Sequence, residues 1–122
     1  MPTSTTRRRV LIVDDYSDAA RTLAMLLDLR GFETRTAADG LEAVEAAEQF
    51  RPDVALLDLG LPGADGYEAC RRIRGESWGK AIRLLALTGR DRSEDREKTA
   101  SAGFNGHLVK PIDLAVLEPM LT

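Results

Sequence analysis

The chain has 122 residues, which predicts one domain that can bury a core without metal or disulfide support. Hydrophobic residues make up 43% and charged residues 30% of it, as in ordinary globular domains, and the net charge of −3 argues against a nucleic-acid surface. A single cysteine, Cys70, excludes an internal disulfide, and no signal peptide or bilayer-length apolar run is visible, so we expect a cytoplasmic location without membrane insertion.

The apolar pattern alternates between short strand-like runs and stretches of helical periodicity. Residues 1–8 are predicted to form a disordered tail, and residues 9–122 a single folded domain. Strand-like runs cover residues 9–13, 32–36, 53–57, 82–87 and 106–109, and helical spacing follows over about 19–30, 39–50, 67–74, 91–102 and from 113. Asp39 is expected to cap the second helix, and Pro119 to end or kink the last one.

Five strands alternating with five helices predict right-handed crossovers and a parallel sheet that is covered on both faces. The predicted fold class is therefore α/β, with a single five-stranded parallel sheet and helices on both faces. The flavodoxin-like strand order 2-1-3-4-5 fits this pattern best.

Five polar residues follow four of the strand-like runs, namely Asp14, Asp15, Asp58, Thr88 and Lys110. Ligands of open α/β sheets bind at the carboxyl ends of the strands, so we expect these residues to form one site. Unit charges about 4 Å apart repel by roughly 4 kcal/mol at an effective dielectric near 20, so three close carboxylates need a proton or a cation. Mg²⁺ suits such a site, whereas the sequence has neither an EF-hand loop for Ca²⁺ nor a ligand set for zinc.

Thr88 and Lys110 add a hydroxyl and an ammonium, which together with a metal would hold the three equatorial oxygens of a transferring phosphoryl group. One carboxylate then remains as the nucleophile, and carboxylates form acyl phosphates in other enzymes. Asp58 is the best candidate because it stands alone at the end of the central strand. Taken singly, Asp15 could be a helix cap, and Thr88 or Lys110 an ordinary strand-end residue.

The motifs at residues 10–15, 56–66, 85–89 and 108–111 closely resemble the receiver domain of two-component response regulators. The resemblance implies that Asp58 accepts a phosphoryl group from the phosphohistidine of a sensor histidine kinase or a histidine phosphotransfer protein. It also implies that Asp15, Asp58 and the backbone carbonyl of Gly60 bind Mg²⁺, with Asp14 acting mainly through water. Lys110, preceding a cis Pro111, would contact Asp58 before phosphorylation and the phosphoryl group afterwards.

By the same resemblance, Thr88 and residue 107 form a switch between the site and an output surface made of the fourth helix, fifth strand and fifth helix. Two positions depart from the family pattern. His107 replaces a frequent Tyr or Phe, and its titration near neutral pH could bias the switch. Gly60 replaces a larger side chain in many relatives, which predicts a short-lived phosphorylated form unless Arg90 shields it.

Other functions stay open at this point. A flavodoxin-like cofactor binder is disfavoured because Asp14 and Asp15 would repel a phosphate, and no glycine-rich phosphate loop is present. An aspartyl-phosphate phosphatase-like enzyme usually separates its two acids by one residue, whereas Asp14 and Asp15 are adjacent. A degenerate receiver that acts only as a binding surface conflicts with the intact five-residue site. We therefore expect no metabolic enzyme, only Mg-assisted autophosphorylation and autodephosphorylation.

The loop sequences at 60–63 and 103–111 look most like receivers attached to hybrid sensor histidine kinases, while the start at Met1 suggests a free-standing protein. No DNA-binding motif occurs, so we expect no direct contact with nucleic acid. No motif indicates an oligomeric state.

Overall fold

The computed structural model describes residues 7–60, 66–89 and 93–121, without the side chains of 93–96. Most of the expected tail at 1–8, the middle of the loop after the third strand, Arg90 and the predicted cap at 91 lie outside these residues. The elements are β1 (Arg9–Val13), α1 (Ser17–Leu29), β2 (Glu33–Ala37), α2 (Gly40–Phe50), β3 (Val54–Asp58), α3 (Gly66–Gly75), the 3₁₀ turn η1 (Ser77–Gly79), β4 (Arg83–Thr88), α4 (Ser93–Ala102), β5 (Gly106–Val109) and α5 (Leu114–Leu121).

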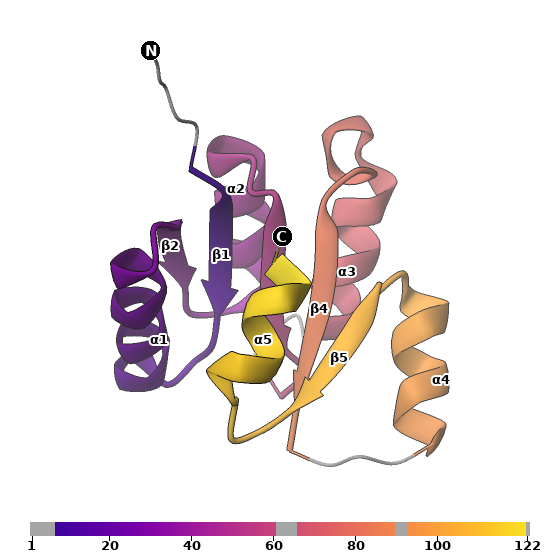
Figure 1. The fold of residues 1–122 in the computed structure, drawn as a ribbon. Coiled ribbons are helices and arrows are strands. Elements are labelled where there is room, and N and C mark those ends of the chain that lie inside the picture. The colour runs from indigo at the N-terminus through magenta and orange to yellow at the C-terminus, as the bar shows by residue number, and fades with distance from the viewer. Residues whose placement is uncertain (1–6, 61–65, 90–92, 122) are drawn as a thin grey trace.

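The five strands form one parallel sheet in the order β2-β1-β3-β4-β5, which confirms the predicted flavodoxin-like order (Figure 1). Strand β3 lies at the centre and is buried along its whole length, whereas β2 is an edge strand with mostly exposed side chains. Since every strand runs the same way, all the carboxyl ends lie at one edge of the sheet, the lower edge in Figure 1.

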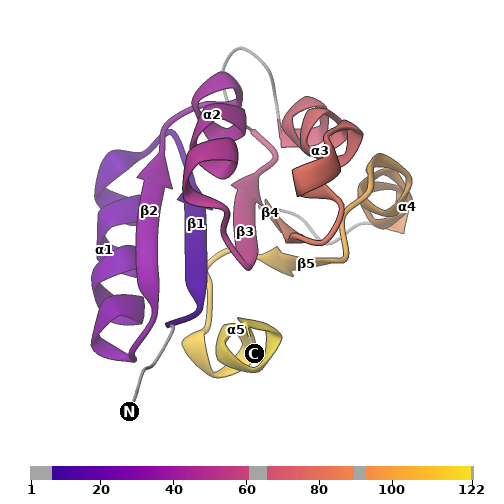
Figure 2. The same cartoon turned by 90° about the horizontal axis from the view of Figure 1, so that it is seen from above.

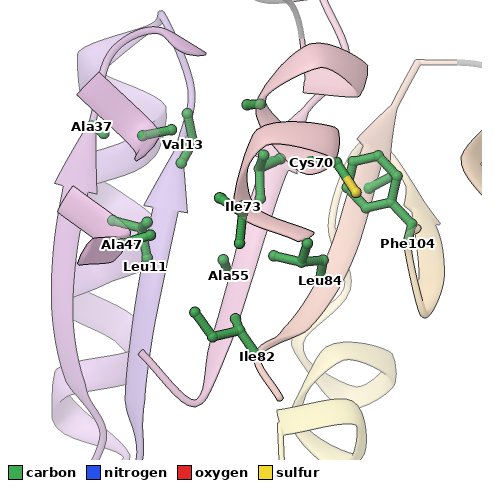
Figure 3. Packing of buried hydrophobic residues seen from close by; sticks show 14 of the residues in the cluster. Leu11, Val13, Ala37, Ala47, Ala55, Cys70, Ile73, Ile82, Leu84 and Phe104 are labelled. Carbon is green, nitrogen blue, oxygen red and sulfur yellow. The ribbon is translucent and has the colours of Figure 1, made fainter. Parts of the chain in front are cut away.

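Alternating residues of the strands feed two separate cores, because successive side chains point to opposite faces. Leu11 and Val13 belong to the core shared with α2, α3 and the end of α4, part of which is drawn in Figure 3. Val10 and Ile12 belong to the core shared with α1 and α5. Figure 2 shows, from above, that α2 and α3 lie on one side of the sheet and α5 on the other. Within the described ranges, no helix combines the length and the apolar character that crossing a bilayer requires.

The ends of α2 and α5 test two of the sequence signals. The Asp39 carboxylate accepts a hydrogen bond from the Glu42 amide at 2.8 Å, which confirms the predicted cap of α2. The sequence predicted that α5 ends or kinks at Pro119. Helix α5 continues to Leu121, so the first of these two alternatives is wrong. Leu117 and Leu121 are fully buried, and their packing outweighs the hydrogen bond that the proline removes.

Cys70 is a buried thiol in the hydrophobic core. Its side chain is fully buried on α3, and Sγ donates a hydrogen bond to the Ala102 carbonyl at 3.3 Å. Burial raises the pKa of the Cys70 thiol to about 11, so the thiolate that reactive cysteines need is scarce at neutral pH.

Arg74 connects α3 to three neighbouring segments through hydrogen bonds of its guanidinium group, which we call the Arg74 clamp. The Arg74 guanidinium, at the end of α3, donates hydrogen bonds to the carbonyls of Gly103, Gly79 and Ile82 at 2.9, 2.8 and 2.7 Å. It also donates to Asn105 Oδ1 at 2.7 Å, and that oxygen accepts a second bond from the Leu84 amide at 2.8 Å. One cation therefore ties α3 to η1, to the start of β4 and to the α4–β5 loop.

Replacing Arg74 with Ala leaves several carbonyl groups without their donor, and we expect the free energy of unfolding to fall by about 3 kcal/mol. Urea denaturation of the two proteins measures this difference. Arg72→Ala is the matched control on the same helix, since Arg72 contacts an exposed Glu68 carboxylate. Equal losses for Arg72→Ala and Arg74→Ala would show that the clamp has no special weight.

Candidate functional site

The predicted site residues meet at the carboxyl edge of the sheet. Asp14 and Asp15 follow β1, Asp58 ends β3, Thr88 ends β4 and Lys110 follows β5. Carboxylate oxygens of the three aspartates all lie within 4.8 Å of one another. The side chains of Asp14 and Asp58 are buried, whereas Asp15 is exposed. The parallel arrangement thus brings together residues that are far apart in the sequence.

Each buried carboxylate is held by two partners. Lys110 Nζ donates to Asp58 Oδ2 at 2.6 Å and to Asp14 Oδ2 at 3.4 Å. The second oxygen of Asp58 accepts from the Gly60 amide at 2.9 Å, and that of Asp14 accepts from the Tyr16 amide at 3.0 Å. These contacts fix the orientation of both acids. Lys110 follows β5, so it reaches acids at the ends of β1 and β3, two strands that do not pair with β5 in the sheet.

The ammonium of Lys110 is stabilised by the acids beside it. Burial by itself lowers the pKa of Lys110, but the hydrogen bond and the negative charge of Asp58, with a smaller contribution from Asp14, outweigh it. The net result is a pKa raised above the ordinary value of 10.5, so the side chain is fully charged at neutral pH.

Backbone hydrogen bonds beyond the strand ends position these side chains. The Asp14 amide donates to the Ala37 carbonyl at 3.1 Å, and the Lys110 amide donates to the Thr88 carbonyl at 2.8 Å. The ladder of the sheet therefore continues one residue past β1 and β5. The Lys110–Pro111 peptide bond is cis, as the family resemblance implied.

Thr88 and His107 occupy neighbouring strands. Thr88 is buried at the end of β4, and Leu87 before it pairs with Asp58 of β3. His107 is half-buried within β5, where it pairs with Ala86, and so it stands inside the sheet rather than among the carboxylates. Sequence reasoning placed both residues correctly by strand.

Gly60 lies directly beside the candidate nucleophile. A Cβ atom at this position would lie 3.5 Å from Asp58 Oδ1, which is an ordinary van der Waals contact. A Cβ atom therefore fits at this position beside the carboxylate oxygen.

A groove of about 650 Å³ opens beside the carboxylates, between α1 and the segment from β5 to α5. Its lining joins the charged groups of Asp14, Asp58 and Lys110 to a largely apolar wall that includes Leu26 and Ile112. Sequence reasoning missed this groove, because helical spacing does not reveal that Leu26 is 39% exposed while its neighbour Leu27 is fully buried.

The donor set fits a hard divalent cation. Among the residues that the structure describes, the three carboxylates have one ammonium beside them, that of Lys110, which contacts Asp14 and Asp58. Three negative charges exceed this one positive charge, and two of the carboxylates are buried. Carboxylate oxygens that lie this close together are the ligands that Mg²⁺ prefers in proteins. The residues at this edge therefore suit a magnesium ion.

Comparisons with known proteins agree with this geometry. Residues 10–122 match the family described as response regulator receiver domain. Among curated proteins, the chain is 39% identical over 117 residues to the transcriptional regulatory protein PrrA of Mycobacterium tuberculosis. This alignment covers 96% of the chain and 49% of PrrA, so the chain spans about half the length of this relative.

Solved structures resemble the chain over nearly its full length. The chemotaxis response regulator CheY4 of Vibrio cholerae superposes with a TM-score of 0.89 and 34% identity, covering 95% of this chain and 97% of that one. The receiver domain of the sensor histidine kinase PA1611 of Pseudomonas aeruginosa PAO1 has a TM-score of 0.86 and 35% identity, covering 95% of both chains. That structure has a magnesium ion coordinated in its active-site cleft.

Replacing Lys110 with Met removes the ammonium that contacts Asp14 and Asp58, and we expect the free energy of unfolding at pH 7 without divalent cations to fall. The loss is limited to about 1 kcal/mol because the lysine side chain is 35% exposed and solvent screens the interaction. Urea denaturation measures it, with Lys80→Met as a control at an exposed lysine.

The sign of the pH dependence follows from the raised pKa. Lys110 contributes its full stabilisation below the ordinary value of 10.5 and loses it as the pH rises through the higher value of the folded protein. The difference between the parent and Lys110→Met should therefore be constant from neutral pH to about pH 10 and shrink above it. A difference that widens in alkaline solution would contradict this assignment.

Proposed function

Because the chain belongs to the response regulator receiver domain family of two-component signalling, we propose that Asp58 is its phosphoacceptor. The observation that carries this proposal is the position of the Asp58 carboxylate, which lies among Asp14, Asp15 and Lys110 with one oxygen 2.6 Å from the lysine ammonium. The donor is the phosphohistidine of a sensor histidine kinase or of a histidine phosphotransfer protein.

The transfer is a substitution at phosphorus. A carboxylate oxygen of Asp58 forms the new O–P bond as the N–P bond of the phosphohistidine breaks, and the imidazole leaves with the electron pair of that bond. Lys110 and the Gly60 amide hold the carboxylate in one orientation before the reaction. Afterwards the Lys110 ammonium and the Thr88 hydroxyl provide a cation and a hydrogen-bond donor for the phosphoryl oxygens.

We assign the metal site to Asp15, Asp58 and the backbone carbonyl of Gly60, with Asp14 acting mainly through water. A bound Mg²⁺ ion would neutralise charge on the carboxylates and on the phosphoryl oxygens. The close cluster of three carboxylates supports this assignment. The magnesium ion in the similar receiver domain of PA1611 supports it as well.

The output of the domain is a shift between two conformations. Thr88, at the end of β4, and His107, in β5, are proposed to link the acceptor to the surface formed by α4, β5 and α5. The domain extends over residues 9–122, with residues 1–8 as a tail, and acts in the cytoplasm. It catalyses its own phosphorylation and dephosphorylation but no metabolic reaction. PrrA is a transcriptional regulator, but we propose no direct nucleic-acid contact for this domain.

Intact mass spectrometry with a small acyl-phosphate donor tests the acceptor. The parent should gain one phosphoryl group with Mg²⁺ and do so at least about tenfold more slowly in EDTA, because the metal balances charge at the site. Asp58→Asn should remain unmodified. Asp28→Asn, a change of an exposed aspartate on α1, should behave like the parent. Undiminished modification of Asp58→Asn would refute the assignment.

The lifetime of the phosphorylated form tests the role of Gly60. We expect Gly60→Met to slow the loss of the phosphoryl group several-fold, since its side chain would occupy the space beside Asp58 Oδ1 and hinder an attacking water. Gly75→Ala is the control, because a Cβ atom there meets open space. Decay of the phosphorylated mass measures both rates, and equal rates for Gly60→Met and the parent would rule out this role.

A further inference from the structure

A second pocket lies at the opposite edge of the sheet, where the strands begin. It has a volume of about 530 Å³ and is lined by Arg8, Arg51, Pro52, Asp53, Trp78, Ala81, Ile82 and Arg83. Arg8 precedes β1, Asp53 precedes β3 and Arg83 opens β4, so the pocket is at the upper edge of the sheet in Figure 1. We call it the basic edge pocket.

The charges in this pocket are not balanced. Three arginines line it against the single carboxylate of Asp53, and Asp53 Oδ2 is already engaged by the Arg9 amide at 2.8 Å. In the part of the chain that the structure describes, Arg8, Arg51 and Arg83 form no ion pair. This local excess of positive charge occurs in a chain whose net charge is −3.

Each of the three guanidinium groups is anchored to the main chain. Arg8 Nε donates to the Leu121 carbonyl at 2.7 Å, and Arg83 Nη1 donates to the Met120 carbonyl at 3.0 Å. Arg51 Nε donates to the Glu48 carbonyl at 2.6 Å. Capping of helix C-termini explains one donor of each side chain, but a guanidinium has five. The remaining donors stay available on side chains whose freedom is already reduced, which lowers the entropic cost of binding.

Arg51 also has an unusual backbone conformation. Its φ angle of 51° lies in the left-handed region, which few residues other than glycine adopt. Its guanidinium carbon lies 5.3 Å from the centre of the Trp78 ring. Trp78 in turn packs against the hydrophobic core to which α2 and α3 contribute. The indole therefore supports the cation at the pocket from one side.

We propose that the basic edge pocket binds a small molecule that carries a diphosphate group. Planar guanidinium groups match phosphate oxygens through paired hydrogen bonds, and three of them suit a group with several negative charges. The volume falls within the range of small-molecule sites and exceeds what a single phosphate needs. The pocket and the carboxylates lie at opposite edges of the sheet, so this inference does not depend on the proposed phosphoacceptor.

Trp78 provides a direct probe, because it is the only tryptophan of the chain and lines the pocket. Inorganic pyrophosphate and ADP are titrated separately in EDTA at constant ionic strength while the indole fluorescence is recorded. We expect a saturable change with half-saturation below about 1 mM, weaker at high salt. A response to both ligands assigns the recognition to the diphosphate, and a response to ADP alone adds the nucleoside to it.

Two variants locate the site. Arg83→Gln keeps an amide that can reach the Met120 carbonyl, and Arg51→Asn introduces a residue that tolerates the left-handed conformation. Each should raise the half-saturation concentration about tenfold or more. Arg21→Gln makes the same change of charge on α1, where Arg21 pairs with Asp18, and should leave binding unchanged. Asp58→Asn should also leave it unchanged.

Several results would overturn the proposal. They are the absence of a saturable signal with both ligands up to about 10 mM, equal weakening of binding by Arg21→Gln, or loss of binding in Asp58→Asn. Circular dichroism checks that each variant folds. If Arg83→Gln does not fold, Arg51→Asn alone decides: binding by Arg51→Asn with the affinity of the parent would reject the site.

Discussion

In the described part of the chain, three carboxylates lie beside one ammonium at the carboxyl edge of a parallel sheet, and the properties of the site follow from this imbalance of charge. Asp14 and Asp58 are buried, and Lys110 Nζ lies 2.6 Å from Asp58 Oδ2 and 3.4 Å from Asp14 Oδ2. The parallel direction of the strands produces this crowding, because it brings the last residue of β3 and the residues that follow β1 and β5 to the same edge. The excess negative charge favours a divalent cation, and the fixed orientation of Asp58 favours its use as an acceptor of a phosphoryl group.

The two edges of the sheet have opposite electrostatic character. The carboxyl edge collects aspartates, while the amino edge collects arginines whose guanidinium groups cap the ends of α2 and α5. Between them runs β3, which is buried throughout, and Arg74 connects α3 to the loops on the amino side. The acceptor and the basic edge pocket involve different residues at opposite edges, so separate variants test them.

The sequence predicted the strands, their order and the meeting of Asp14, Asp15, Asp58 and Lys110 at one edge, because apolar runs and the residues that end them are local signals. Other features depend on contacts that leave no such signal. The Arg74 clamp binds backbone carbonyls, which every residue possesses. The exposure of Leu26 beside the buried Leu27 depends on how α1 is rotated against the sheet. The continuation of α5 past Pro119 depends on burial of Leu121, and the basic edge pocket combines arginines from three distant segments.

Calorimetric titration of Mg²⁺ tests the central claim most directly, because it asks whether the crowded carboxylates form one cation site. The account predicts saturable binding of one ion to the parent and at least about tenfold weaker binding to Asp15→Asn, which loses a charged ligand. Asp28→Asn, which makes the same change on the exposed side of α1, should bind like the parent. Absence of binding by the parent, or equal affinity of Asp15→Asn and the parent, would contradict the account.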